Sequence, residues 1–492
     1  MRGATLARLS SVSLAATMFV AACGGGGAPA SSTTAPAAAA PTPAPTKPAA
    51  AAASPAASPA AAVAASPSAS PAASPAASPA ASPVASPAAA AAVPVAAASP
   101  VPAGAGNAAN LTGTIRVVSS LPRTGSPKGQ TDTIVNSFRM ALTEHNNKVG
   151  NATIDYVDMD DATAARGSWD PAQEASNANK AGPDADVMVY LGTFNSGAAK
   201  VSIPILCPQN LAMISPANTY PGLTKSTPYN APNEPDVYYP NGCKRNYSRV
   251  AATDDLQGAV GAVFAQQLGV SKVYVLHDSD LYGQGIAEVF AATAKKLNLN
   301  VVGGPEGIDP SASDYRAVAQ KIRGTGADFV YFGGVTDHNA GKLWQDLRST
   351  LGNDVKLMGP DGINEAAFVD AAGAAAEGTY GSFPGVPGSK LTTQKGQDWY
   401  RRYKQQFQGE PDPYAAYGYE AMNVALAAIE RAGVKDRARI RDAVFATRDY
   451  DGVLGKWSFT DTGDTTLTGM SVRQVRNGKW DDETTQALQA PQ

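Results

Sequence analysis

The sequence has few of the side chains that most often carry catalysis or bind metal ions. Three of its 492 residues are histidine and three are cysteine. No two histidines stand in a close metal-ligand spacing such as H-E-x-x-H, and the G-x-S-x-G motif of serine hydrolases does not occur. The sequence therefore predicts a protein that is not an enzyme and that holds neither a metal ion nor a cofactor.

Charged residues are few in the chain as a whole, largely because a long, nearly uncharged segment near the N-terminus dilutes them. Charged residues make up 16% of the chain, the formal net charge is -3, and lysine and arginine form no cluster. Nucleic-acid binding depends on such clusters because phosphate contacts supply most of the affinity. We therefore expect no nucleic acid as a partner. The only marked hydrophobic run lies near the N-terminus and is too short to cross a bilayer.

The N-terminus has the organisation of a secretory signal peptide. Two arginines flank the start of the chain, a mainly apolar run covers 9–19, and small residues lead to Cys23. This ending resembles a bacterial lipoprotein signal, although Val20 stands where leucine is usual. We expect 1–23 to be a lipoprotein signal and a lipid on Cys23 to anchor the protein to the extracytoplasmic side of the cell membrane. An ordinary cleaved signal is the alternative.

Residues 24–112 consist almost wholly of Ala, Ser and Pro, with repeated S-P-A-A units. Prolines break helices, and the segment lacks the large apolar side chains that a core requires. We predict a disordered tether here, with the folded part beginning near Gly113.

Beyond the tether, apolar runs alternate between the strand and the helix pattern. A strand is predicted over 114–119, a helix over 131–148, a strand over 152–158 and a helix over 171–179. The alternation continues to about residue 358 and predicts parallel α/β sheets. Because the folded part is longer than one core usually holds, we predict two lobes.

The stretch 186–224 reads as a βαβ unit with two polar loops. Apolar runs over 187–191 and 212–214 each lead into a cluster of Gly, Pro, Ser, Asn and Thr. Ligands of parallel sheets bind beyond the carboxyl ends of the strands, and Ser196 and Thr219 occupy these two places. Hydroxyls beside a helix N-terminus suit a carboxylate. A helix cap and a turn are the alternative roles of these two residues.

Two cysteines remain besides Cys23. Cys207 and Cys243 are expected to form a disulfide, because a secreted protein folds in an oxidising compartment. Two buried free thiols are the alternative, since the sequence does not give the distance between them.

Six motifs in order resemble the leucine/isoleucine/valine-binding proteins of ABC transporters, which are type I periplasmic binding proteins. The resemblance covers about 113–480 and implies two doubly wound parallel-sheet lobes, joined by three crossing segments, that close over a ligand. The motifs are LPRTGSPKG (121–129), MISPANT (213–219), RVAATDDLQG (249–258), HDSDLYGQG (277–285), DFVYFGG (328–334) and GPDG (359–362).

The resemblance also implies the division of the chain between the lobes. Lobe one would take 113–250 and 378–447, and lobe two 251–377 and 448–485. The crossing segments would lie near 249–253, 377–382 and 448–452.

The same resemblance implies the binding residues. Two loops of lobe one would hold the carboxylate of the ligand, and lobe two would meet its amino group through an acid and cover it through a tyrosine. This chain has Asp361 where the family usually has glutamate. It has Val335 directly after Gly334, where amino-acid binders of the family often have an aromatic residue. The implied ligand-binding residues are Asn195, Ser196, Asn218, Thr219, Tyr282 and Asp361.

These features imply a solute-binding lipoprotein of an ABC importer, which captures a small amphoteric ligand such as an amino acid and delivers it to a permease. A binder of an amide, a urea or an aromatic acid, or a ligand-sensing receptor component of the same fold, is the alternative. A secreted α/β enzyme is a further alternative, but the sequence offers no nucleophile, metal or cofactor motif for it.

Overall fold

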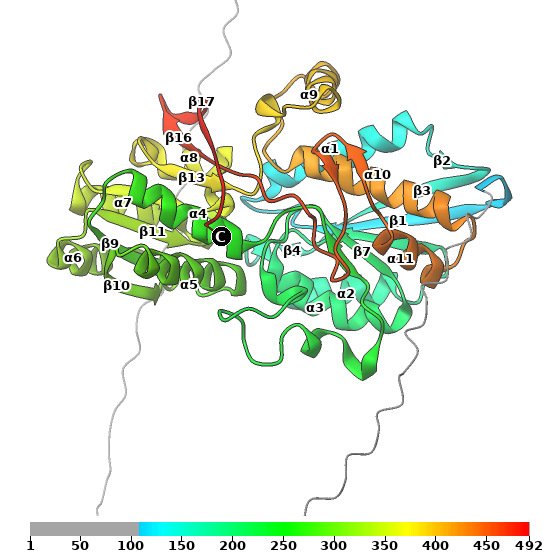
Figure 1. Ribbon diagram of the computed structural model, residues 1–492, viewed down its shortest axis with the longest axis horizontal. Coiled ribbons are helices and arrows are strands. Elements are labelled where there is room, and N and C mark those ends of the chain that lie inside the picture. Colours follow the sequence, from blue (N-terminus) through cyan, green and yellow to red (C-terminus); the bar gives the residue numbers. More distant parts are fainter. Residues whose placement is uncertain (1–107, 492) are drawn as a thin grey trace, which may run out of the picture. The chain divides into compact units, whose positions relative to one another are not determined.

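A computed structural model of the protein describes residues 108–491, which belong to one compact unit. The predicted lipoprotein signal with Cys23 and nearly all of the predicted tether lie outside the described residues. Two large β-sheets, each covered by helices on both faces, form two lobes (Figure 1). This confirms the predicted α/β class with two doubly wound lobes. Within the described part, no helix is long and apolar enough to span a membrane.

The sheet of lobe one has six strands. All neighbouring strands pair in parallel except β2 with β3. Strand β6 is buried along its whole length, as expected for a strand with helices on both faces. The strand order is β2 (Lys148–Val149), β3 (Ala152–Asp160), β1 (Thr114–Leu121), β6 (Val187–Gly192), β7 (Ala212–Ser215) and β8 (Tyr247–Arg249).

Helices cover both faces of this sheet. Helices α1 (Lys128–Glu144) and α10 (Ala415–Ala432) pack together on one face, and α2 (Pro171–Ala181) and α3 (Ser196–Leu206) on the other (Figure 1). Lobe one also contains two later helices, α9 (Gln394–Phe407) and α11 (Arg437–Phe445). It further contains two small hairpins, one of β14 (Tyr450–Gly452) and β15 (Gly455–Trp457) and one of β4 (Ala162–Thr163) and β5 (Ser168–Trp169).

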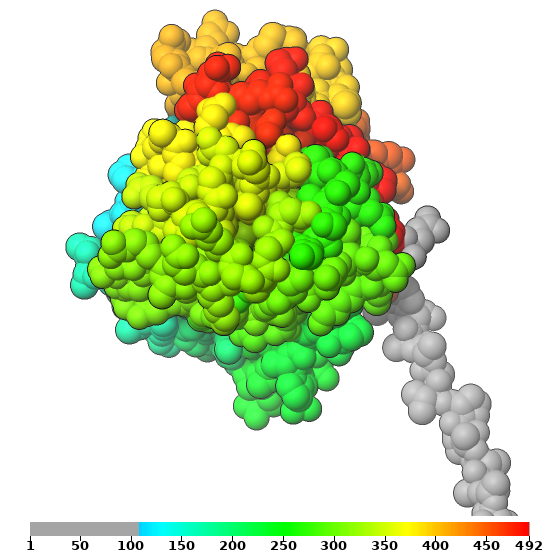
Figure 2. Space-filling model, turned by 90° about the vertical axis from the view of Figure 1, so that its left-hand side faces the viewer, coloured from blue at the N-terminus to red at the C-terminus, as the bar shows by residue number. Residues whose placement is uncertain are grey.

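The sheet of lobe two has seven strands, of which the first five are parallel and the last two antiparallel. In the space-filling view the C-terminal strands, in red, lie along one edge of this lobe (Figure 2). The strand order is β10 (Asn300–Gly307), β9 (Lys272–His277), β11 (Phe329–Gly333), β12 (Lys356–Gly359), β13 (Tyr380–Phe383), β16 (Met470–Arg476) and β17 (Lys479–Leu488).

Two groups of helices cover the second sheet. Helices α4 (Asp254–Gln267) and α5 (Leu281–Lys296) pack together and share one apolar core with the sheet. Helices α6 (Arg316–Thr325), α7 (Ala340–Leu351) and α8 (Ala366–Ala372) share another core on the opposite face. The short helices α8 and α11 were not foreseen from the sequence.

The chain crosses between the lobes three times. The first crossing lies at Val250–Thr253 in the expected place, because Ala251 packs in the core of lobe one and Ala252 in that of lobe two. The other two differ from the expected division. Strand β13 pairs within the sheet of lobe two, so the second crossing follows Phe383. Trp457 and Phe459 fill the core of lobe one, which places the third crossing after them and before β16.

A buried ion pair joins the first and third crossings. Arg249 is fully buried, and its Nε donates to Asp464 Oδ1 at 2.8 Å. The same guanidinium donates to the Tyr220 carbonyl at 2.7 Å. Thr224 donates its hydroxyl to Asp464 Oδ1, also at 2.8 Å. Both crossings are thereby tied to the loop that follows β7.

The predicted disulfide between Cys207 and Cys243 is confirmed, with a distance of 5.9 Å between the two Cα atoms. It ties the irregular segment 221–246 to the end of α3. Inside the segment, Glu234 is buried and accepts hydrogen bonds from the hydroxyls of Tyr220 and Tyr238. The disulfide and this buried carboxylate hold a segment that contains only single helical turns.

Candidate ligand-binding site

The loops that form the site follow strands at the points where the strand order of each sheet reverses. In lobe one, β3 and β6 lie on opposite sides of β1, and in lobe two, β10 and β11 lie on opposite sides of β9. Loops diverge at such points and leave a crevice beyond the carboxyl ends of the strands. The loop after β6 leads into α3, the loop after β9 leads into α5, and the two loops belong to different lobes.

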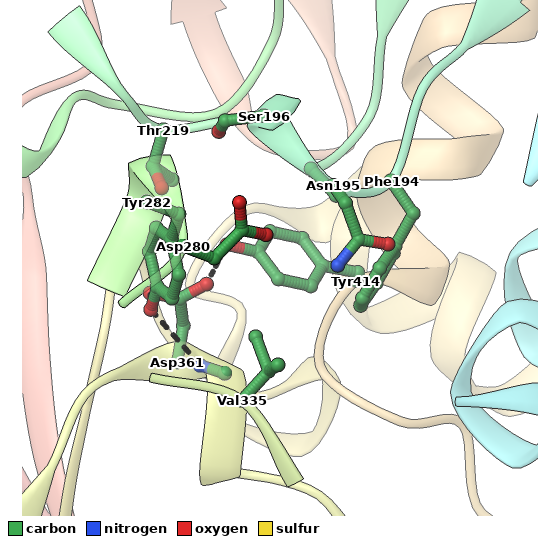
Figure 3. A pocket seen from close by; sticks show the side chains of 11 residues that line it. Phe194, Asn195, Ser196, Thr219, Asp280, Tyr282, Val335, Asp361 and Tyr414 are labelled. Carbon is green, nitrogen blue, oxygen red and sulfur yellow. Dashed lines mark hydrogen bonds between the residues drawn. The ribbon is translucent and has the colours of Figure 1, made fainter. Parts of the chain in front are cut away.

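These two loops, together with the loops after β7, β11 and β12 and the start of α10, surround one pocket (Figure 3). Its free volume is about 20 Å³, enough for one water molecule. A larger ligand therefore requires the walls to move apart, which a hinge between lobes allows. Five of the six predicted residues line the pocket. The lining residues are Phe194, Asn195, Ser196, Ala217, Thr219, Asp280, Tyr282, Val335, Asp361, Gly362 and Tyr414.

Lobe one supplies polar groups beside a helix N-terminus. Ser196 is the first residue of α3, and its Oγ accepts a hydrogen bond of 3.3 Å from the Tyr220 backbone N–H. Its own hydroxyl proton is thus available to a ligand. Asn195 Oδ1 is buried and has no hydrogen-bond partner among the described residues. Together with Thr219 and the N-terminus of α3, these groups form a site that suits a carboxylate.

Asn218, the sixth predicted residue, does not line the pocket. Its side chain is fully buried, and its Nδ2 donates to the Phe194 carbonyl at 2.7 Å. Its Oδ1 accepts a hydrogen bond of 2.9 Å from the Tyr247 hydroxyl on β8. Asn218 therefore connects the loop after β6 to strand β8, and it supports the pocket wall from behind.

Lobe two supplies a buried carboxylate. Asp361 begins the single turn that follows β12, and its Oδ1 accepts a hydrogen bond of 2.6 Å from the Tyr282 hydroxyl. Its Oδ2 accepts a bond of 2.8 Å from the Tyr414 hydroxyl, which comes from lobe one. We expected Tyr282 to cover the ligand through apolar contact. Its hydroxyl also orients Asp361 and accepts a bond from the Gly362 N–H.

A second carboxylate lies close to Asp361. Burial raises the pKa of Asp254 well above its usual range, and the nearby Asp361 raises it further. Burial also raises the pKa of Asp361, against the effect of the hydrogen bonds from Tyr282 and Tyr414. Both carboxyl groups resist ionisation because their charges would be poorly solvated and would repel each other. An ammonium group placed here would favour the ionised form of a carboxyl group and pair with it.

Six of the eleven lining residues were not among the predicted binding residues, and three of these six carry aromatic or acidic side chains. Asp280 stands in the quoted motif HDSDLYGQG, directly before α5, and its place after a strand was a usable signal. Phe194 stands in the polar loop that the βαβ pattern had already identified. Tyr414 comes from a distant segment at the start of α10 and carries no local signal.

Comparison with known proteins agrees with this geometry. A leucine/isoleucine/valine-binding protein homolog of Brucella abortus (strain 2308) is 29% identical over 73% of this chain and 89% of its own. The crystal structure of a leucine-binding protein from Thermotoga maritima has a TM-score of 0.66 and 24% identity, and the match covers 77% of this chain and 99% of that protein.

A solute-binding protein of an ABC transporter from R. palustris, solved in complex with benzoate, has a TM-score of 0.63 and 18% identity, and covers 76% of this chain and 98% of its own. At such identities the two solved structures support the fold alone. The sequence model described as "Periplasmic binding protein" matches residues 114–479. The chain therefore belongs to the periplasmic binding protein family, whose members bind solutes and are not enzymes.

Proposed function

We propose that this protein is the solute-binding component of an ABC importer and that it captures an α-amino acid between its two lobes. The observation that carries this proposal is the opposite chemistry of the two pocket walls. Lobe one presents hydroxyls and a helix N-terminus at Ser196, and lobe two presents the buried carboxylate of Asp361. An amphoteric ligand pairs with both walls at once and so binds the closed form best.

The side chain of the ligand would meet a mainly apolar surface. Phe194, Ala217 and Val335 contribute apolar side chains to the pocket lining. Branched aliphatic side chains suit such a surface, and the name of the Brucella relative refers to leucine, isoleucine and valine. We therefore propose a small aliphatic amino acid as the ligand.

An aromatic monocarboxylate is the second candidate, because one solved relative holds benzoate. Asp280 and Asp361 line the pocket here, and none of the described lining residues is a lysine or an arginine. A ligand with a carboxylate and no amino group would leave Asp361 without a positive partner. This chemistry favours the amino acid over the aromatic acid.

Titration calorimetry with four compounds tests the proposal. Leucine carries both charged groups, 4-methylpentanoate lacks the amino group, 3-methylbutylamine lacks the carboxylate, and benzoate represents the aromatic acids. We expect leucine to bind and each truncated compound to lose at least about tenfold in affinity, since a hydrogen bond to a charged group contributes roughly 1.5–3 kcal/mol. Tighter binding of benzoate than of any amino acid would overturn the proposal.

We further propose that the protein is held outside the cytoplasm by a lipid on Cys23 and delivers its ligand to a permease in the same membrane. The support is the V-A-A-C ending of the predicted signal and the membership of the periplasmic binding protein family. Metabolic labelling with a radioactive fatty acid tests the anchor, and Cys23→Ala should abolish the label. Deletion of the gene should abolish uptake of the ligand. Uptake that persists would contradict the transport role and favour a sensing role.

A further inference from the structure

Asp280 lies on the pocket wall and makes contacts beyond those of a helix cap. It precedes α5, and its Oδ1 accepts a hydrogen bond of 2.8 Å from the Leu281 backbone N–H. Its Oδ2 accepts a second bond, of 3.2 Å, from Trp169 Nε1. Trp169 ends β5 of lobe one. The carboxylate is therefore shared between a helix of lobe two and a strand of lobe one, at the edge of the pocket.

The Asp280 carboxylate faces the first turn of α3. A methyl group added to Gly197 would lie 3.2 Å from Asp280 Oδ1 and 2.5 Å from the Trp169 ring. Gly197 directly follows Ser196, so the carboxylate points toward the side of the pocket that we assign to the acid end of the ligand (Figure 3). Lobe two thus brings a negative group to the end of the pocket where a negative ligand group is expected.

The charged groups around Asp280 do not cancel its charge. Asp278 precedes it on the same loop, and Asp337 and His338 face it from the turn after β11. His338 is already paired with Asp278, through a contact of 2.7 Å. From lobe one the contact is the neutral N–H of Trp169. Burial raises the pKa of Asp280 and Asp278 raises it further, while His338 lowers it.

Resting on the proposed function, we propose that Asp280 is a specificity-determining residue that responds to the charge at the acid end of the ligand. A ligand carboxylate beside α3 binds together with one proton, which it shares with the Asp280 carboxyl group. A carboxamide at the same place needs no proton, because its N–H groups donate to ionised Asp280. The site takes α-amino acids and their amides, distinguishes them by pH, and rejects ligands that carry a second negative charge.

The affinity for leucine relative to leucinamide isolates this effect. The two compounds share the side chain and the ammonium group, so the contribution of Asp361 cancels. Between about pH 5 and pH 7 both ammonium groups remain largely protonated. We expect the ratio to rise as pH falls, by up to about tenfold per pH unit, the limit for uptake of one proton. Calorimetry in buffers of different ionisation enthalpy should show that leucine takes up one proton more than leucinamide.

Asp280→Asn removes the charge and keeps one oxygen acceptor, which can serve the N–H group of Leu281 or that of Trp169 but not both. In this variant we expect a ratio that does not change with pH and an equal proton uptake for the two ligands. Glu288→Gln is the matched control, because it removes one negative charge from α5 at a residue that does not line the pocket. It should keep the wild-type ratio at every pH.

Trp169→Phe gives a second measurement that does not depend on folding of the Asp280 variant. It removes the hydrogen bond that lowers the pKa of Asp280, so the rise of the ratio should begin at a higher pH. A ratio that does not vary with pH in the wild type, or that varies equally in Asp280→Asn, would overturn this inference and leave the proposed function standing. If neither leucine nor leucinamide binds, the proposed function fails and this inference fails with it.

Discussion

Tyr414 and Asp361 belong to different lobes, lie 53 residues apart in the sequence, and are joined by a hydrogen bond of 2.8 Å between the Tyr414 hydroxyl and Asp361 Oδ2. The bond joins the two lobes at the pocket and forms only when the lobes are closed. Because Asp361 is also the proposed partner of the ligand's amino group, one carboxylate would respond both to the ligand and to the opposite lobe. A ligand with higher affinity for this arrangement would shift the protein toward it.

The first prediction concerns the charge of Asp361. Asp361→Asn keeps an oxygen acceptor for one tyrosine hydroxyl, can donate its amide N–H to the other, and removes the partner of the ammonium group. We expect a loss of roughly 2–5 kcal/mol in binding free energy for the best amino acid, measured by calorimetry. Wild-type affinity should also fall on acidification, because burial raises the pKa of Asp361 and its protonated form cannot pair with an ammonium ion.

The melting temperature of the Asp361 variant without ligand serves as its control. It should remain near the wild-type value, and small-angle scattering should show less compaction on addition of ligand than in the wild type. Wild-type affinity and full compaction in the variant would show that Asp361 only stabilises its turn, and would direct attention to Asp254.

The second prediction concerns the hydroxyls of lobe one. Ser196→Ala and Thr219→Val each remove one hydroxyl from the carboxylate end of the pocket. We expect each variant to lose roughly 1.5–3 kcal/mol of binding free energy by calorimetry, since a hydrogen bond to a charged group is among the strong ones. Asn218→Asp, behind the pocket wall, serves as a contrast. It removes the amide that donates to the Phe194 carbonyl and should lower the melting temperature. Unchanged affinity in both hydroxyl variants would return these residues to capping and turn roles.

The third prediction concerns the disulfide. Replacing Cys207 and Cys243 by serine opens a loop with a sequence separation of 36 and should lower the free energy of unfolding by roughly 3–4 kcal/mol. Urea denaturation measures this loss. Mass spectrometry of the unreduced wild type after alkylation provides the control, and alkylation of both thiols there would contradict the bond.

The fourth prediction concerns pH and Glu174, a buried residue of α2. Its carboxylate accepts hydrogen bonds from Ser120, at 2.5 Å, and Tyr190, at 2.9 Å, and burial raises its pKa from 4.5 to about 7. The folded protein thus holds this proton more tightly than the unfolded chain. The contribution of Glu174 to stability is greatest below about pH 4.5 and falls as pH rises to about 7.

Glu174→Gln removes this dependence. Relative to the wild type, the variant should gain up to about 3 kcal/mol of stability between pH 5 and pH 8, because each pKa unit corresponds to about 1.4 kcal/mol. Urea midpoints at the two pH values measure the gain. Glu430→Gln, on the exposed side of α10, should show none. Parallel pH profiles of the wild type and Glu174→Gln would refute the assignment.

The local pattern of the sequence was enough to single out two residues of lobe one that line the pocket. Ser196 and Thr219 follow two parallel strands, and the βαβ rule alone places such residues at one edge of a sheet. Tyr282 and Asp361 required the resemblance to a family, since a tyrosine in a helix and an aspartate in a turn have many other roles. The structure brings all four to one pocket.

Other features depend on long-range packing that a local pattern does not contain. Tyr414 reaches the pocket from a segment more than fifty residues beyond Asp361, and nothing around it marks its hydroxyl as a partner of that acid. Trp457 and Phe459 are apolar residues that either lobe could bury. The sequence shows that such side chains need a core, but only the fold determines which core receives them.

The ion pair of Arg249 and Asp464 bears on how the protein would behave in salt. The side chain of Arg249 has no exposed surface and that of Asp464 only 9%. Dissolved ions screen exposed charges over about 10 Å at ordinary ionic strength but act much less on charges that water does not reach. The ion pair between Lys225 and Asp255, whose side chains are 32% and 25% exposed, would weaken in concentrated salt. The Arg249–Asp464 pair at the two crossings should therefore keep its geometry in concentrated salt, while exposed ion pairs around it weaken.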